Sequence, residues 1–386
     1  MISSTATDSF LRNLDRLECG HITIETPDGK TRVFEGTAPG PAAVLSLRDW
    51  RVIGNLAVHG DIGFAEDYRE GLWDTRNLQD LLSLALANEK AIDAFIFGSM
   101  PARVLARLSN LLRINTLRGS KRNISAHYDL GNDFYRLWLD PTMTYSSAIF
   151  KNGEQDLRQA QLAKYDRLID GTHSTSGKVL EIGCGWGGFA ARALERGDYT
   201  VKGITLSARQ KEYADAHLNG RADIVLEDYR HQQGAYDSIV SIEMFEAVGE
   251  QYWPAYFEKI AQLLKKGGHA MIQTITIADS RFARYRESGD FIRKFIFPGG
   301  MLPSPSRFAA AANAAGLRVT DRFDFGQDYA RTLEMWLENF DKAKPQVLAQ
   351  GYDEKFIRMW RFYLAACIAG FRTGRTDVMQ VGLIHA

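Results

Sequence analysis

From about residue 170 to 280 the chain alternates short apolar runs with stretches of helical periodicity. The apolar runs have the length and composition of buried strands, and they cover residues 179–182, 199–206, 222–226, 237–242 and 269–275. Between them, residues 208–218 and 251–265 place apolar side chains at three- and four-residue steps, as one face of a helix does. Strand and helix in alternation over this length predict a doubly wound α/β sheet with right-handed crossovers.

The first hundred residues show a different pattern. Residues 22–26 alternate apolar and polar side chains, and residues 31–34 return as a second strand after a Pro-Asp-Gly-Lys turn that begins at Pro27. Proline presets φ and glycine accepts a positive φ, so a β-hairpin is expected. A further strand over 42–47 and a leucine-rich helix near 78–86 indicate a small mixed α+β domain.

Two segments interrupt these patterns. Residues 278–305 are rich in Arg, Phe, Gly and Pro, and we interpret them as an insertion that covers a site. A basic connector without acidic residues contains Arg103, Arg107, Arg113, Arg118, Lys121 and Arg122. This connector is either a solvated linker or a patch for anionic lipid headgroups. We therefore predict an N-terminal accessory domain, residues 1–110, and a larger α/β domain, residues 111–386.

Composition narrows the functional classes. Lys and Arg number 47 and so do Asp and Glu, which argues against nucleic-acid binding by broad phosphate neutralisation. Cys19, Cys184 and Cys367 are far apart, which argues against a disulfide framework and favours a reducing cytoplasm. No His, Asp or Glu spacing indicates a metal site. We expect no signal peptide and no transmembrane span, because no apolar run approaches ~18 residues.

A glycine-rich loop follows the first strand of the α/β region. Residues 183–188 read Gly-Cys-Gly-Trp-Gly-Gly and lead into a helix, whose N-terminus favours hydrogen-bond acceptors and negative charge. The loop fits the G-x-G-x-x-G dinucleotide fingerprint, which also requires an Asp or Glu about 20 residues later. The next strand ends at 203–207 without an acid, and Gln210 is the nearby side chain suited to ribose hydroxyls. A NAD site is therefore disfavoured, although it stays open.

The segment 179–188, Val-Leu-Glu-Ile-Gly-Cys-Gly-Trp-Gly-Gly, resembles motif I of S-adenosylmethionine (SAM) methyltransferases. Its Gly-Cys-Gly-Trp-Gly form is similar to that of the cyclopropane fatty acid synthase and mycolic acid cyclopropane synthase family. Further matches to this family are residues 126–135, 143–146, 203–207, 243–249, 295–300 and 325–329. The resemblance implies a Rossmann-like SAM-methyltransferase fold over about residues 120–386, an acyl-site insertion near 278–305, and an extra N-terminal domain that binds lipid or pairs two subunits.

The resemblance also implies which residues contact SAM. They come from the ends of successive strands, where open α/β sheets bind ligands. Tyr145 and Ser146 are expected at the methionine carboxylate, Thr205, Leu206 and Gln210 at the ribose, Asp228 and Tyr229 at the adenine, and Glu181, Gly183, Cys184, Gly185 and Gly187 in the loop beneath the cofactor.

The implied reaction transfers a methyl group from SAM to a carbon–carbon double bond, after which one proton must leave. Family members that form a cyclopropane hold a bicarbonate ion as the base, and the corresponding positions here are Ser147, Glu246, Gln273 and Tyr329. Ser147 stands where the family has Cys and Gln273 where it has His, and a glutamine amide cannot titrate near neutral pH. Bicarbonate then binds more weakly, or Glu246 and Tyr329 act without it. Glu243 is three residues before Glu246, and we expect it to support Glu246 from the same helical face.

These features predict a SAM-dependent C-methyltransferase that adds a methyl or methylene carbon to unsaturated acyl chains of phospholipids. The enzyme would be cytoplasmic and peripherally associated with the inner face of the membrane, with a homodimer as one arrangement. Cyclopropane formation is slightly favoured over methyl- or methylene-branched products without ring closure. A small-amine N-methyltransferase and a non-catalytic lipid-binding homologue are the alternatives, the latter suggested by Ser147 and Gln273.

Overall fold

The computed structural model describes residues 2–96, 130–151 and 156–386. The chain packs as two compact units. The first comprises residues 1–112, 283–298 and 344–375, and the second comprises residues 113–282, 299–343 and 376–386. The predicted division near residue 110 lies close to the first of these junctions, and two later segments also pack within the first unit. The separate roles expected for the two parts stay predictions.

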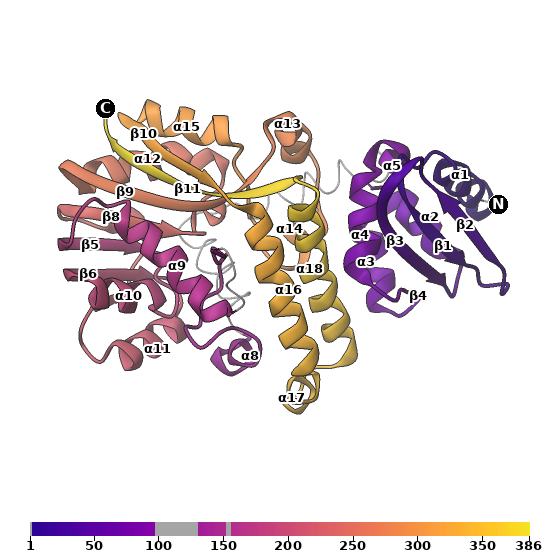
Figure 1. Ribbon diagram of the computed structural model, residues 1–386, viewed down its shortest axis with the longest axis horizontal. Coiled ribbons are helices and arrows are strands. Elements are labelled where there is room, and N and C mark those ends of the chain that lie inside the picture. Colours follow the sequence, from indigo (N-terminus) through magenta and orange to yellow (C-terminus); the bar gives the residue numbers. More distant parts are fainter. Residues whose placement is uncertain (1, 97–129, 152–155) are drawn as a thin grey trace. The chain divides into compact units, whose positions relative to one another are not determined.

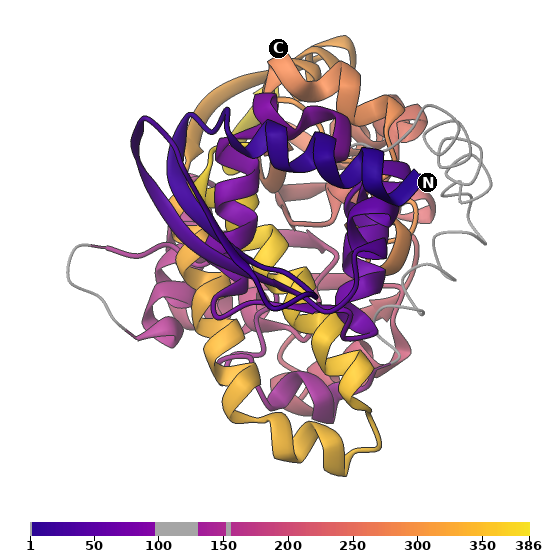
Figure 2. The same cartoon turned by 90° about the vertical axis from the view of Figure 1, so that its right-hand side faces the viewer.

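The first unit is built on a four-stranded sheet of order β2-β1-β3-β4. The strands are β1 (Cys19–Glu25), β2 (Thr31–Glu35), β3 (Ala38–Leu47) and β4 (Trp73–Asp74). The expected hairpin is confirmed: β1 and β2 are antiparallel, with Ile22 opposite Phe34, and Gly29 in the turn has φ +78°. Strand β3 runs parallel to β1, and Figure 2 shows these long strands in indigo.

Helices complete the first unit. They are α1 (Ile2–Leu14), α2 (Arg51–His59), α3 (Asp61–Arg69), α4 (Leu78–Ala87), α5 (Glu89–Ile96), α14 (Phe291–Phe295), α17 (Lys344–Ala349) and α18 (Glu354–Arg372). Helix α4 packs on β1 and β3, and α18 packs on α3 and α4. The predicted smaller α+β N-terminal domain is thereby confirmed.

The segment 278–305 forms α13 (Asp279–Glu287) and α14 rather than continuing the strand–helix alternation. Within the first unit, Asp61 Oδ2 accepts a hydrogen bond of 3.1 Å from the Phe291 backbone N–H. The Phe291 ring meets Phe362 edge to face, with 4.9 Å between ring centroids. The expected role of the segment 278–305 as a cover for an acyl chain stays a prediction.

The second unit contains a seven-stranded sheet of order β10-β11-β9-β8-β5-β6-β7. The strands are β5 (Ser176–Ile182), β6 (Asp198–Thr205), β7 (Asp223–Leu226), β8 (Tyr236–Ile242), β9 (Leu264–Ile277), β10 (Leu317–Asp324) and β11 (Thr376–His385). Strands β5 to β9 pair in parallel, whereas β11 is antiparallel to both of its neighbours. The five predicted strands are confirmed, and β10 and β11 are additional.

Helices lie on both sides of this sheet, as a doubly wound fold requires. Helices α9 (Leu157–Asp170), α10 (Gly188–Arg196) and α11 (Ala208–Leu218) gather on one side, and α12 (Trp253–Leu263) and α15 (Pro305–Ala314) on the other (Figure 1). The remaining helical segments are α8 (Asn132–Arg136), α16 (Gly326–Lys342) and the 3-10 turns η1 (Tyr229–His231), η2 (Phe245–Ala247) and η3 (Glu250–Tyr252). The predicted helix over 251–265 is shorter than expected, because β9 begins at Leu264.

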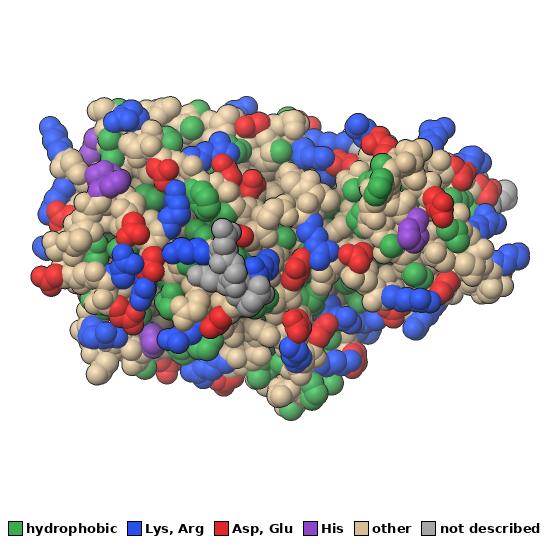
Figure 3. All heavy atoms as spheres, viewed as in Figure 1, with side chains coloured by type: hydrophobic (Ala, Val, Ile, Leu, Met, Phe, Trp, Pro, Cys, Tyr) green, Lys and Arg blue, Asp and Glu red, His purple; other side chains and the backbone are tan. Residues whose placement is uncertain are grey.

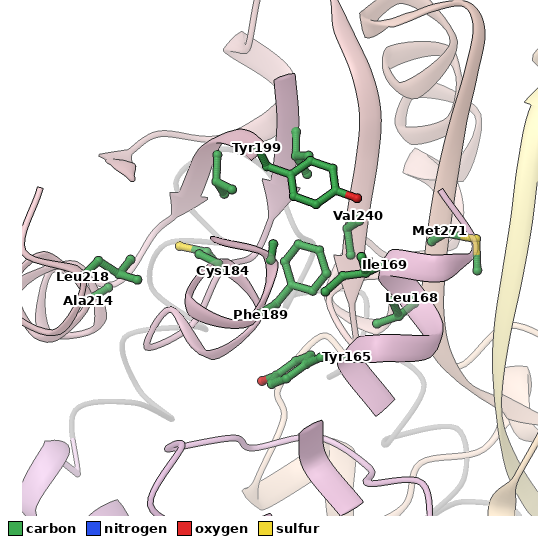
Figure 4. Packing of buried hydrophobic residues seen from close by; sticks show 14 of the residues in the cluster. Tyr165, Leu168, Ile169, Cys184, Phe189, Tyr199, Ala214, Leu218, Val240 and Met271 are labelled. Carbon is green, nitrogen blue, oxygen red and sulfur yellow. The ribbon is translucent and has the colours of Figure 1, made fainter. Parts of the chain in front are cut away.

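The hydrophobic core beneath α9, α10 and α11 supports the loop that connects β5 to α10. Phe189 on α10 is 2% exposed and packs in one cluster with Ile169, Tyr199 and Val240 (Figure 4). Residue Val240 points to this side of the sheet while Ile239 is buried on the other, which is the period-two alternation of a strand covered on both faces. The glycine loop between β5 and α10 therefore lies on a rigid base.

The surface carries both signs of charge. On the face shown in Figure 3, Lys and Arg side chains are interspersed with Asp and Glu. Among the helices that the structure describes, none combines the length and apolar character needed to cross a membrane. Within the same residues there is no group of three or more His, Cys, Asp or Glu side chains that could hold a metal ion. The basic connector, residues 103–122, lies outside the described residues.

Candidate active site

The glycine loop has the backbone that its sequence demands. Gly183, Gly185 and Gly187 have φ values of +82°, +52° and +87°, in the left-handed region that favours glycine. The backbone N–H groups of Gly183 and Cys184 both donate to the Ile204 carbonyl, at 2.9 and 3.0 Å, which ties the loop to the end of β6. A Cβ built on Gly185 would meet nothing within 4 Å, so the loop presents open backbone there.

Cys184 and Glu181 lie buried at and just before the glycine loop. A Cβ built on Gly203 would lie 2.9 Å from Cys184 Cβ, so the thiol side chain fills the core under the loop. Glu181 is the penultimate residue of β5 at 2% exposure, and burial raises the pKa of its carboxyl to about 8 against the opposing charge of Lys164. Its Oε2 has no hydrogen-bond partner in the described part of the chain. A bound ligand with N–H or O–H donors would satisfy this buried acceptor.

The side chains expected at the ribose are already organised at the end of β6. Thr205 Oγ1 donates to Gln210 Oε1 at 2.8 Å, which leaves the Gln210 amide N–H groups available to a ligand. Ser207 caps α11 by accepting from the Gln210 backbone N–H at 3.3 Å. Leu206, between them, is half-buried. Cap and hydroxyl together fix the position of Gln210.

The pair expected at the adenine lies at the start of η1, where Asp228 is the N-cap and Tyr229 the first residue. Asp228 Oδ1 accepts from the Arg230 backbone N–H at 3.0 Å and from Nε at 2.8 Å, and Oδ2 accepts from the guanidinium at 2.6 Å. Burial raises the pKa of Asp228, but the hydrogen bonds from Arg230 outweigh it and hold the pKa below its ordinary value. Tyr229 is 9% exposed and stacks edge-on against Tyr256 at 5.4 Å. Asp228 therefore stays ionised and forms an ion pair with Arg230.

Ser146 is held by α9 from beneath. Its Oγ accepts a hydrogen bond of 2.7 Å from Lys164 Nζ, and its carbonyl accepts one of 2.9 Å from Gln161 Nε2. Lys164 is fully buried, and burial lowers the pKa of its ammonium to about 7, while the charge of Glu243 opposes that shift. This lysine was not anticipated from the sequence, because its position on α9 gives no sign of which loop it supports.

Aromatic rings form a continuous series through the second unit. Trp186 of the glycine loop lies 5.1 Å from Tyr135, which lies 5.5 Å from Tyr145. Tyr145 lies 5.3 Å from Trp336, which lies 6.1 Å from Tyr329. Trp186 Nε1 also donates to Asn132 Oδ1 at 2.8 Å, which fixes its plane. The series joins the candidate cofactor loop to the residues expected to be catalytic.

Three donors expected to be catalytic meet at one carboxylate, that of Glu243. The Ser147 backbone N–H donates to Oε1 at 2.8 Å, and Gln273 Nε2 donates to the same oxygen at 2.8 Å. Tyr329 O–H donates to Oε2 at 2.6 Å. Burial raises the pKa of Glu243, and the hydrogen bonds from Tyr329, Ser147 and Gln273 oppose that shift. The structure thus brings together Ser147, Gln273 and Tyr329 as predicted, but around Glu243.

A polar relay fixes the orientation of Gln273. Gln380 Nε2 donates to Gln273 Oε1 at 2.9 Å, and Arg167 donates to Gln380 Oε1 at 2.9 Å. A guanidinium only donates, so Gln380 must present its oxygen to Arg167 and its NH₂ to Gln273. Gln273 in turn must present its NH₂ to Glu243. Gln380 lies on β11, a strand that the sequence did not reveal.

Glu246 has a different environment. Its Oε1 accepts from the Ile275 backbone N–H, and its Oε2 is buried without a hydrogen-bond partner in the described part of the chain. Burial, and then the charge of Glu243, raise the pKa of Glu246 to about 8. Glu243 lies in the bend after β8 and Glu246 in η2, so the two do not share one helical face as we expected.

The described residues fit SAM but not bicarbonate. The open glycine loop, the orphaned oxygen of Glu181 and the available amide of Gln210 together offer the backbone, acceptor and donor groups that such a cofactor requires. The donors expected to hold bicarbonate, by contrast, are already bonded to the carboxylate of Glu243.

Comparison with known proteins defines the class to which this fold and site belong. A model of the family described as mycolic acid cyclopropane synthetase matches residues 115–381. The chain is 38% identical to the tuberculostearic acid methyltransferase of Mycobacterium tuberculosis, over 91% of this chain and 86% of that protein. It is 34% identical to the cyclopropane-fatty-acyl-phospholipid synthase of Escherichia coli, over 90% of this chain and 88% of that protein.

A solved structure of a mycolic acid cyclopropane synthase is similar to this fold. Mycolic acid cyclopropane synthase CmaA1, complexed with S-adenosylhomocysteine (SAH) and CTAB, superposes with a TM-score of 0.64 at 33% identity, covering 68% of this chain and 97% of that one. The protein is therefore a SAM-dependent methyltransferase whose class modifies lipid acyl chains. It belongs to the mycolic acid cyclopropane synthetase family.

Proposed function

We propose that the protein transfers the methyl carbon of SAM to the double bond of an unsaturated acyl chain in a membrane phospholipid. The observation that carries this proposal is the aromatic series from Trp186 to Tyr329, which ends at a carboxylate held by three donors. An alkene is a weak nucleophile, and its alkylation leaves a positive charge on carbon. Aromatic faces stabilise such a charge, and a carboxylate can then remove a proton.

When bound, SAM supplies an electrophilic methyl group. The residues of this chain have three further tasks. The glycine loop and Gln210 hold the cofactor, with Tyr145 and Ser146 at its methionine end and Asp228 and Tyr229 at its adenine. Tyr145, Trp336 and Tyr329 offer ring faces to the developing cation. Buried packing at Ser147 and Gln273, both 0% exposed, keeps water away from a cation that would otherwise be hydrated.

The product is either a cyclopropane or a methyl-branched chain. Loss of a proton from the new methyl group closes a ring, and loss of a proton elsewhere leaves an unsaturated branched chain. The relatives include proteins named as methyltransferases and as cyclopropane synthases, so both products belong to the proposal. We propose ring closure as the first outcome to test.

The test is incubation of the purified protein with SAM and vesicles of monounsaturated phosphatidylglycerol and phosphatidylethanolamine. SAH formation reports turnover, and mass spectrometry of the lipids reports the product. A gain of one CH₂ with loss of the double bond indicates a ring, and a gain of one CH₂ with the double bond kept indicates branching. Saturated phospholipid is the control. Absence of SAH with the unsaturated vesicles, from protein that binds SAM, contradicts the proposal.

A further inference from the structure

We propose that Glu243 is the catalytic base of this enzyme, a carboxylate built into the chain at the place where a bound bicarbonate ion was expected. The inference rests on the proposed function and exchanges the roles expected for the two glutamates. Glu246 then lies beside the reacting site without taking the proton. Three observations on this chain support it.

The first observation is the set of donors around the carboxylate. The Ser147 N–H, the Gln273 amide and the Tyr329 hydroxyl come from three separate segments and converge on the two oxygens of Glu243 at 2.6–2.8 Å. The Gln273 amide cannot turn its oxygen to Glu243, because Gln380 and Arg167 fix its orientation. The site is therefore built for an anion with two oxygens, and the side chain of Glu243 is that anion.

The second observation is the backbone of Glu243. Its φ is +50°, in the left-handed region that residues with a Cβ rarely adopt. Its long side chain cannot offset this cost by the local hydrogen bonds available to Asn or Asp. The backbone N–H of Glu243 donates to the Gln273 carbonyl at 2.8 Å, which holds the strained residue at the end of β8. Strain kept in this way is typical of functional positions.

The third observation is position. Ser147 and Gln273, which donate to Glu243, are fully buried. Its hydrogen-bond partner Tyr329 is the last ring of the aromatic series, 6.1 Å from Trp336. A cation formed along that series would lie beside the carboxylate. The donors thus hold the carboxylate of Glu243 beside the last ring of the aromatic series.

The step balances without a further reactant. The π electrons of the alkene form the new C–C bond to the methyl carbon, and the electrons of the broken S–C bond stay on sulfur. Glu243 then accepts one proton from carbon. The electrons of that C–H bond form either the third bond of the ring or a new C=C bond. Glu243 returns the proton to water when the product leaves.

The experiment compares wild type, Glu243→Gln, Glu243→Gly and the exposed matched control Glu258→Gln in CO₂-free buffer, with and without millimolar bicarbonate. We expect wild type and Glu258→Gln to be equally active and insensitive to bicarbonate. Glu243→Gln should lose about 100-fold or more in turnover, with or without bicarbonate, because its amide fills the site but cannot accept the proton. Glu243→Gly relieves the positive φ and empties the site, so bicarbonate should restore its activity at least about 10-fold. The double variant Glu243→Gly with Gln273→His should respond at lower bicarbonate concentration.

Two results would overturn the inference. One is a wild type that loses activity when bicarbonate is removed, and the other is Glu243→Gln turnover within about threefold of wild type. SAM affinity and thermal midpoint are measured for every variant to confirm folding. If wild type does not act on phospholipid at all, the proposed function fails, and binding of ¹³C-bicarbonate followed by NMR then tests the site itself. Binding to Glu243→Gly but not to wild type supports the built-in carboxylate, and binding to wild type contradicts it.

Discussion

At the residue scale, Glu243 and Glu246 are three positions apart, but their carboxyl groups have different hydrogen-bond partners. Glu243 accepts hydrogen bonds from Ser147, Gln273 and Tyr329, which favour its charged form. Glu246 accepts from one backbone N–H, and burial, followed by the charge of Glu243, raises its pKa to about 8, so it keeps a proton at neutral pH. A proton on Glu246 removes one of the two negative charges that the pair could carry, which lowers the cost of burying it.

This difference predicts a pH dependence of stability. The pKa of Glu246 rises from 4.5 to about 8 on folding, so between these values the folded state binds more protons than the unfolded state, and its contribution to stability falls as pH rises. Glu246→Gln removes that dependence. The free energy of unfolding of the variant, relative to wild type, should increase by up to about 1.4 kcal/mol per pH unit between about pH 5 and pH 8. Urea denaturation at several pH values measures it, and a constant difference would refute the assignment.

A second residue-scale prediction concerns the relay behind Gln273. Gln380→Leu removes the donor that fixes the Gln273 amide, so Glu243 should lose a well-directed hydrogen bond. We expect kcat to fall about 10-fold, as the loss of roughly 1–1.5 kcal/mol implies, with little change in KM for SAM. A double-mutant cycle with Glu243→Gln checks the mechanism. The two losses should not add if Gln380 acts through Glu243, whereas additive losses would point to a general effect on folding.

At the element scale, the β5–α10 loop was predictable because its chemistry is local. Three glycines in left-handed conformation and a helix beginning at Gly188 follow from residues 183–188 alone. The meeting of Ser147, Gln273 and Tyr329 followed only from the family resemblance. The presence of Glu243 at their centre did not follow from either source, because it depends on the backbone path after β8.

The loop can be tested by a pair of matched glycine substitutions. Gly185 and Gly220 both have positive φ, +52° and +75°, and a Cβ on either meets nothing within 4 Å. Alanine at each should therefore cost a similar ~1 kcal/mol of stability. Only Gly185→Ala places a methyl group above the cofactor loop, so it should weaken SAM binding about 10-fold or more, whereas Gly220→Ala should not. Calorimetric titration with SAM measures both, and equal affinities would remove Gly185 from the cofactor site.

At the scale of the whole molecule, the pattern of the sequence predicted the centre of the large sheet but not its antiparallel edge. Strand β10 is mostly exposed and polar, and β11 is separated from β9 by about a hundred residues. Strand β10 carries no local signal that distinguishes an edge strand from a loop, whereas β11 is buried over residues 378–383 and its place between β10 and β9 depends on pairing with distant segments. The relay through Gln380 was missed for the same reason, since its strand was not expected. The pairing of β11 with β9 therefore brings Gln380 to Gln273, and this part of the site could not be predicted from the local sequence.

Membrane association is a property of the whole molecule, and the basic connector gives it a test. The connector lies outside the described residues, so its prediction rests on sequence. If Arg118, Lys121 and Arg122 meet anionic headgroups, each contributes about 1 kcal/mol near the surface, and reversing all three to Glu should weaken binding to vesicles rich in phosphatidylglycerol more than about 100-fold. Raising the salt concentration should weaken wild-type binding in the same direction, because the attraction is screened. Vesicle sedimentation measures the binding, with SAM affinity as the control for folding. Unchanged sedimentation of the triple variant would show that these cations form a solvated linker and that another surface meets the lipid.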